Sequence, residues 1–125
     1  MSVNDLIKSA RNVVLLNALP LNAFTSPVVL KIIPLSSNDA INAINALKNS
    51  GASVKCFIGH PPTVALLTTL GLTVNCTRAM WTYNNEDLII AAVLKARPAA
   101  PGAGDVNVTL GDLLFYIIVP TPISP

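Results

Sequence analysis

Charged side chains are scarce in this chain of 125 residues. Asp, Glu, Lys and Arg together make up 11% of it, whereas they make up about 25% of a typical soluble domain. The formal net charge is only +2, and Lys and Arg together number eight. Binding a long DNA duplex rests on many contacts from such residues to phosphates, so nucleic acid is an unlikely partner. A small anionic ligand held by a few residues is easier to accommodate.

The chain also lacks a long apolar run, although 52% of its residues are hydrophobic. The longest runs, Leu88 to Leu94 and Leu113 to Val119, fall far short of the about 20 residues that a membrane-spanning helix needs. A secretory signal peptide fits poorly, because Asn17, Pro20 and Asn22 interrupt the apolar stretch near the N-terminus. We therefore expect a soluble, intracellular protein with no membrane partner. Its apolar composition favours an oligomer.

Residues with reactive side chains are few. Histidine, the residue type that changes charge near neutral pH, occurs once, at His60. The two cysteines, Cys56 and Cys76, lack the spacing of a metal site, so we expect two buried free thiols, with a disulfide as the alternative. The sequence shows no Ser-His-Asp set, paired carboxylates, metal-binding cluster or glycine-rich phosphate loop. We expect neither a metal nor a cofactor.

Apolar runs separated by turn residues outline the secondary structure. The expected strands span residues 12–18, 28–34, 52–58, 87–96 and 113–119. The Ala and Leu residues of 87–96 also favour a helix, but the preceding turn and the Leu-Ile-Ile start favour a strand. The expected helices span residues 3–10, residues 63–70, and a longer stretch that Ser36 or Ser37 caps and Gly51 ends. Residues 73–83 are rich in β-forming side chains, and the stretch from Tyr83 to Asp87 predicts a hairpin turn. Residues 98–104 predict a flexible loop.

These elements predict one α/β domain. Strands and helices alternate in the first half and a β-meander follows, which favours a single mixed β-sheet of about five strands with flanking helices. We place this domain at residues 12–119, after an N-terminal arm at residues 1–11 that the core does not need. Residues 120–125 form a Pro-rich tail that is expected to be loose.

The stretch from Ile58 to Thr63 reads Ile-Gly-His-Pro-Pro-Thr and predicts a turn from a strand into a helix. It places His60 at the helix N-terminus, where backbone N–H groups and the helix dipole favour an anion. The two prolines suit the first helical turn but carry no N–H group. A phosphate there would therefore need the amides of Thr63 and Val64, the Thr63 hydroxyl, or side chains from elsewhere.

Each candidate residue also has a purely structural interpretation. A single histidine such as His60 is often a structural residue, although strand-to-helix turns carry sites in α/β folds. Arg78 and Arg97 suit surface positions, but Arg is the natural bidentate ligand of phosphate and the chain has only three. Asn17, at the end of the first expected strand, suits either a turn or a hydrogen bond to a base or ribose.

Several of these features occur in a characteristic order. They are Leu16-Asn17-Ala18, Ile58-Gly59-His60-x-x-Thr63, the helix pattern Thr-x-x-Leu-Leu-x-x-Leu-Gly-x-x-Val over residues 63–74, Asn75-x-x-Arg78, and Lys95-x-Arg97 before a Gly-bearing loop. This series resembles the viral ring nucleases of archaeal viruses and some mobile elements. These type III anti-CRISPR proteins were long described as a domain of unknown function. The resemblance covers residues 13–119 and excludes the N-terminal arm.

The resemblance implies an α/β homodimer in the host cytoplasm that binds cyclic tetra-adenylate and cuts it into linear di-adenylates, blocking type III CRISPR signalling. It also implies a reaction without metal, in which a ribose 2′-hydroxyl attacks the adjacent phosphate and His60, the general acid, protonates the leaving 5′-oxygen. Thr63 and the backbone from Gly59 to Val64 would hold phosphate or ribose. Arg78 and Arg97 would neutralise the phosphates. The residues expected to line the ligand cleft are Asn17, Ala18 and Asn22.

One position departs from the family pattern Arg-x-x-Glu-Gly, because Ala100 stands where the family has Glu. In the family that carboxylate supports the histidine or the attacking hydroxyl. Its replacement leaves a second function open, that of a sponge that binds the cyclic nucleotide without cutting it. A viral nucleic-acid-binding dimer is a third, which the low number of basic residues argues against.

Overall fold

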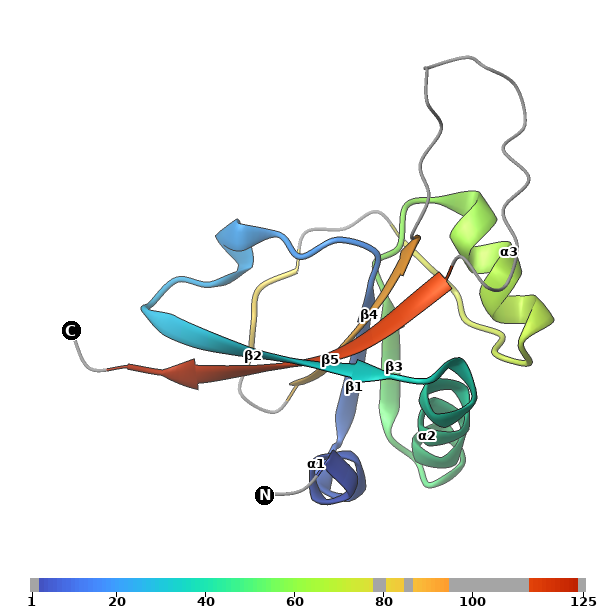
Figure 1. Cartoon of the computed structure of the whole chain (residues 1–125), viewed down its shortest axis with the longest axis horizontal. Helices are drawn as coiled ribbons and strands as arrows, with labels where there is room; N and C mark the ends of the chain where they lie inside the picture. The colour runs from blue at the N-terminus through green and yellow to red at the C-terminus, as the bar shows by residue number, and fades with distance from the viewer. Residues whose placement is uncertain (1–2, 78–80, 85–86, 95–112, 124–125) are drawn as a thin grey trace, which may run out of the picture.

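The computed structural model of the chain describes residues 3–77, 81–84, 87–94 and 113–123. Figure 1 shows the elements that these residues form. In chain order they are α1 (Val3–Ser9), β1 (Asn12–Leu16), the 3₁₀ turn η1 (Leu21–Ala23), β2 (Val28–Leu35), α2 (Ser37–Asn49), β3 (Ser53–Cys56), α3 (Pro61–Thr69), β4 (Asp87–Leu94) and β5 (Leu113–Pro122). The predicted α/β class, with one mixed five-stranded sheet and flanking helices, is confirmed within this part of the chain.

The strands lie in the order β2-β5-β4-β1-β3. β1 runs parallel to both β3 and β4, whereas β5 is antiparallel to β4 and β2. Three strands therefore end at the same edge of the sheet, and ligands of α/β proteins commonly bind at such an edge. Figure 1 shows α2 and α3 on one side of the twisted sheet and η1 on the other.

The central strands are buried on both faces, as their sequences predict. Val13 to Leu16 of β1 and Leu88 to Ala92 of β4 are buried without interruption. Such continuous apolar runs are typical of strands with parallel neighbours and cover on both faces. The edge strand β2 instead alternates between partly buried and exposed residues over most of its length.

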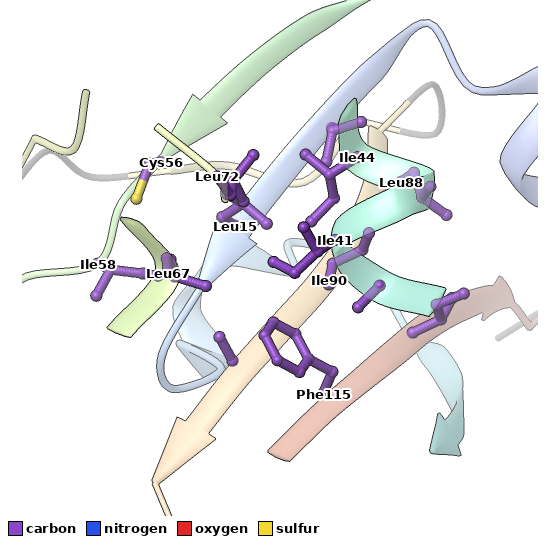
Figure 2. Packing of buried hydrophobic residues seen from close by; sticks show 14 of the residues in the cluster. Leu15, Ile41, Ile44, Cys56, Ile58, Leu67, Leu72, Leu88, Ile90 and Phe115 are labelled. Carbon is purple, nitrogen blue, oxygen red and sulfur yellow. The ribbon is translucent and has the colours of Figure 1, made fainter. Parts of the chain in front are cut away.

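The larger core cluster lies between the sheet and the helices (Figure 2). Leu15 from the sheet, Ile44 from α2, Leu67 from α3 and Phe115 from β5 all meet there with almost no exposed surface. Burying each of these side chains contributes about 1.5–3 kcal/mol relative to leaving it exposed. This cluster fixes α3, and with it the turn that precedes α3, against the sheet.

Helix α2 begins and ends where its sequence predicts. The Ser36 side chain accepts a hydrogen bond from the Asp39 amide at 3.2 Å, which is the N-cap interaction. Gly51, just after the helix, has φ +98°, a conformation that glycine adopts without strain.

A second, smaller cluster covers the other face of the sheet. It combines sheet residues such as Val14 and Ile89 with Ala23 of η1 and with Trp81. Phe24, Trp81 and Tyr83 pack their rings together, with centroids 5.4 to 6.2 Å apart. The loop around η1 and the segment at 81–84 therefore take the place of helices on this face.

The predicted β-rich stretch before β4 is wrong for the residues that the structure describes, and so is the hairpin. The predicted turn is present, because the Asp87 amide donates to the Asn84 carbonyl at 2.8 Å. Residues 73–77 make only an isolated bridge between Cys76 and Cys56, and residues 81–84 form no strand. The Asp87 carboxylate instead accepts hydrogen bonds from the Trp81 indole and the Asn84 amide, both at 3.1 Å. These local bonds compete with a strand ladder, and β4 pairs in parallel with the distant β1.

The two ends of the chain are more closely tied to the domain than their sequences predict. Ile7 of α1 and the following Ala10 pack against the larger core, although the arm was expected to be dispensable to it. β5 continues to Pro122, which pairs with Val28. Part of the expected loose tail therefore belongs to the sheet. Among the described residues, no helix is long and apolar enough to cross a membrane.

Candidate functional site

The candidate site lies where β1 and β3 end side by side. Leu15 is in register with Cys56, and the Phe57 amide donates to the Leu15 carbonyl at 2.9 Å. Asn17 directly follows β1, while Gly59 and His60 follow β3 after two intervening residues. The parallel pairing thus brings segments that are about forty residues apart in sequence to one edge of the sheet.

Helix α3 starts at this edge with His60 as its N-cap residue, in extended conformation. Pro61 and Pro62 occupy the first two helical positions, as their fixed φ favours. The next two amides, of Thr63 and Val64, both donate to the His60 carbonyl, at 3.1 and 3.3 Å. The two amides foreseen as phosphate ligands are therefore already engaged within the turn.

The His60 ring is held by a neighbour one turn into the helix. Its Nδ1 lies 2.9 Å from the Thr63 hydroxyl oxygen. Thr63 has no exposed surface, whereas His60 is partly exposed. This contact leaves Nε2 as the ring nitrogen that can meet a ligand, so the imidazole is placed for proton transfer at one defined atom.

Two cavities open beside the ends of these strands. The first, of about 520 Å³, lies against the outer side of the turn and α3. The residues that line it are Ile58, Gly59, Pro61, Val64, Ala65, Thr68 and Cys76. The second, of about 360 Å³, lies between the loop after β1 and the residue after β3. Its lining residues are Leu16, Ala18, Leu19, Pro20, Asn22, Phe57 and Trp81.

The second cavity combines apolar, aromatic and amide groups. Phe57 and Trp81 supply aromatic walls, and Asn22 supplies a side-chain amide with both donor and acceptor atoms. Trp81 is held in place by the hydrogen bond from its indole to Asp87. Flat apolar walls with an amide at one side suit a planar heterocycle that carries hydrogen-bonding edges.

Cys56 and Cys76 form a disulfide, with their Cα atoms 4.4 Å apart. The expectation of two free thiols was therefore wrong, and the alternative was right. The two cysteines meet because the segment after α3 lies beside the end of β3, where the Thr77 amide also donates to the Cys56 carbonyl at 2.9 Å. The bridge fastens the segment after α3 to the end of β3, two residues before Arg78 in the sequence.

Comparisons with known proteins identify the fold. No protein-family model matches the chain, and no curated protein matches it. The solved structure of B116 of Sulfolobus turreted icosahedral virus is similar, with a TM-score of 0.68. The two share 21% sequence identity over 86% of this chain and 98% of B116. The chain has the fold of a viral protein. At this level of identity the likeness concerns the fold alone.

The predicted site residues that the structure describes fall into separate groups at this edge of the sheet. Gly59 lines the first cavity, Ala18 and Asn22 line the second, and His60 and Thr63 are in contact. Asn17 is half-buried at the end of β1. Arg78, Arg97 and Ala100, together with the loop predicted at residues 98–104, lie outside the described residues. No group of three or more His, Cys, Asp or Glu residues that could hold a metal occurs in the described part.

Sequence reasoning missed Phe57 and Trp81 as cavity residues. Both carry a signal that could have been used. Phe57 directly follows β3 at the edge where the site was expected, and Trp81 is the only tryptophan of the chain. What the sequence could not show is that a segment after α3 returns to this edge and packs beside the loop after β1.

Proposed function

We propose that this chain is a ring nuclease, a metal-independent phosphodiesterase that binds cyclic tetra-adenylate and cleaves it to linear di-adenylates. In an archaeal host cell this activity would block type III CRISPR signalling. The observation that carries the proposal is the His60 imidazole, held through Nδ1 by Thr63 at the carboxyl ends of parallel strands. The substrate class is the one implied by the family resemblance of the ordered motifs around His60. A fold shared with a viral protein agrees with the proposed origin.

The proposed reaction needs one proton donor and a fixed geometry. A ribose 2′-oxygen forms a bond to the adjacent phosphorus, the bond from phosphorus to the 5′-oxygen breaks, and His60 protonates that oxygen from Nε2. The proton of the 2′-hydroxyl passes to solvent, from which His60 is later reprotonated. Two such cuts give two linear di-adenylates, each with a 2′,3′-cyclic phosphate and a 5′-hydroxyl. A general acid of this kind typically contributes about 10²- to 10⁴-fold to the rate.

The second cavity fits one part of this substrate. An Asn side chain can bond both the N6 and N7 atoms of adenine, and Asn22 offers such an amide beside apolar walls. Stacking of a base on an aromatic ring contributes about 1–3 kcal/mol. We assign an adenine to this cavity and the phosphates to Arg78 and Arg97, as the family resemblance implies.

A homodimer would match the symmetry of the ring. A twofold dimer presents two copies of each arginine to a ligand with four phosphates. The exposed apolar residues on β2 and the neighbouring β5 support self-association, since Ile32 on β2 is 58% exposed and Leu114 on β5 is 36% exposed.

The proposal is tested by incubating radiolabelled cyclic tetra-adenylate with the protein in excess EDTA. The wild-type protein should give linear products, and His60→Ala should lose about 10²-fold or more of the cleavage rate. Asn42→Ala, an exposed position on α2, is the matched control and should cleave as the wild type does. Absence of product from the wild type, or equal product from His60→Ala, would contradict the proposal.

The alternative function is a sponge that binds the ring without cutting it, which Ala100 motivates. Trp81 is the only tryptophan and lines the second cavity, so its fluorescence should report binding of cyclic tetra-adenylate. Binding without turnover, together with cleavage gained by Ala100→Glu, would favour the sponge. Absence of binding would exclude both functions.

A further inference from the structure

The hydroxyl of Thr63 is buried at the base of the candidate site. Among the residues that the structure describes, Thr63 is the only polar or charged residue in the buried class, with 0% exposure. Its oxygen lies 2.9 Å from Nδ1 of His60. A side chain without exposed surface presents no face to a ligand. The phosphate- or ribose-binding role implied by the family resemblance is therefore not available in this arrangement.

The turn fixes the two residues relative to each other. Thr63 is the third residue of α3 and His60 is its N-cap, so the pair occupies the positions at which capping side chains normally meet. The imidazole makes no capping bond to the helix backbone, because the Thr63 amide instead donates to the His60 carbonyl. The β-branched Thr63 side chain is also stiff about χ1. Backbone and side chain together set the direction of the ring.

We infer that Thr63 is a positioning residue, whose hydroxyl holds Nδ1 and fixes the direction of the His60 ring so that Nε2 exchanges the proton. The inference rests on the proposed function, in which His60 is the general acid. In the imidazolium form, Nδ1–H donates to the Thr63 oxygen and Nε2–H faces the leaving group. After Nε2 gives up its proton, the neutral ring keeps its Nδ1–H and the same hydrogen bond. The ring does not have to turn during the cycle.

The Thr63 hydroxyl differs from a carboxylate in the same position because it orients the His60 ring without carrying a charge. A carboxylate partner would add a negative charge beside the ring and favour its cationic form. The neutral Thr63 oxygen orients the ring without adding charge next to an incoming phosphate. This matters in a chain where Ala100 replaces the carboxylate of the family pattern.

The first test reads the tautomer directly. Because His60 is the only histidine, ¹⁵N-labelled full-length protein gives one imidazole spin system in long-range ¹H–¹⁵N spectra above neutral pH. The wild type and Thr63→Ser should show the same tautomer ratio, since both keep the hydroxyl that contacts Nδ1. Thr63→Val, which keeps the shape but removes the hydroxyl, should change that ratio. An unchanged tautomer in Thr63→Val, with its melting temperature preserved, would overturn the inference.

The second test separates positioning from substrate binding. In the EDTA cleavage assay, Thr63→Val should lower kcat by about 10-fold or more with little change in KM, and Thr63→Ser should recover most of the rate. Equal losses in both variants would show a packing effect, and a raised KM with unchanged kcat would show a ligand contact. Either result would overturn the inference. If the wild type does not cleave at all, the proposed function fails, and the spectra still decide whether Thr63 orients His60.

Discussion

At the scale of single residues, local hydrogen bonds determine which polar side-chain atoms can still contact a ligand. His60 keeps Nε2 available because Nδ1 is engaged by Thr63, and Asp87 is engaged by Trp81 and Asn84. The same carboxylate also acts on Tyr83. Burial, and secondly the charge of Asp87, raise the pKa of the Tyr83 hydroxyl above its ordinary value of 10.0. The Tyr83 hydroxyl therefore stays protonated and neutral to a higher pH in the folded protein than in the unfolded chain.

This shift predicts a loss of stability at alkaline pH. The unfolded chain ionises Tyr83 near its ordinary value, whereas the folded chain resists ionisation. The contribution of Tyr83 is therefore complete below about pH 10 and is lost as the pH rises through the folded pKa. Urea unfolding between about pH 9 and 11 should show a smaller decline for Tyr83→Phe than for the wild type. Tyr116→Phe is the control, and an equal decline in all three proteins would contradict the assignment.

At the scale of elements, the disulfide ties the segment after α3 to the end of β3. Cys56 and Cys76 are separated by 20 positions. Closing a loop of this length typically stabilises a protein by about 2–4 kcal/mol. The bridge also keeps Cys76 on the wall of the first cavity, which Gly59 lines as well. It thereby links the stability of the sheet edge to the shape of the candidate site.

Reduction should therefore lower the free energy of unfolding by about 2–4 kcal/mol. The measurement is urea unfolding with and without a phosphine reductant, with thiol titration to confirm that both sulfurs are released. The double variant Cys56→Ala/Cys76→Ala is the control, because its stability should not respond to the reductant. A wild type with two titrated thiols and unchanged stability would show that the bridge does not contribute.

The elements that the sequence predicted well are those defined by contacts close in the chain. The apolar runs at β1 and β4, the Ser36 cap and the Gly51 stop are visible in short stretches of sequence. The hairpin before β4 and the free thiols were wrong because their outcome depends on pairing between distant segments. A continuous apolar strand does not reveal which neighbour it will join, and cysteine spacing does not reveal proximity.

The candidate site also combines features that short stretches of sequence show with features that depend on contacts between distant segments. The sequence placed Asn17 at the end of one strand and His60 at the turn after another, but the parallel pairing that brings both to one edge comes from the fold. The burial of Thr63 could not be predicted either, since it depends on how α3 packs against the sheet. The cavity between Asn22 and Trp81 likewise requires the fold, because it joins the loop after β1 to a segment beyond α3.

At the scale of the whole molecule, most of the exposed large apolar side chains among the described residues lie on β2, on β5 or directly after β5. Ile32 of β2 pairs with Ile118 of β5, and the exposed Leu114 lies on the same face of β5. The half-buried Tyr116 stands between them on that face. Exposed apolar side chains on one face of a chain with little charge favour self-association.

We accordingly expect a dimer in solution that depends on this face. Sedimentation velocity at micromolar concentration should give the mass of two chains for the wild type. Ile32→Lys should shift the population toward the monomer, because it places a charge on the associating face. Asn42→Lys, on an exposed position of α2, should leave the mass unchanged. A wild type with the mass of one chain would remove the dimer from the proposal.

The proposed role of His60 as general acid is tested most directly by single-turnover cleavage of cyclic tetra-adenylate in excess EDTA. The measured quantity is the ratio of the rate constants of the wild type and His60→Ala, with enzyme in excess over the ring so that product release does not enter. The mechanism predicts linear di-adenylates with 2′,3′-cyclic phosphate ends and a ratio of about 10² or more. A ratio near one, or a wild type that binds the ring and never opens it, would contradict it.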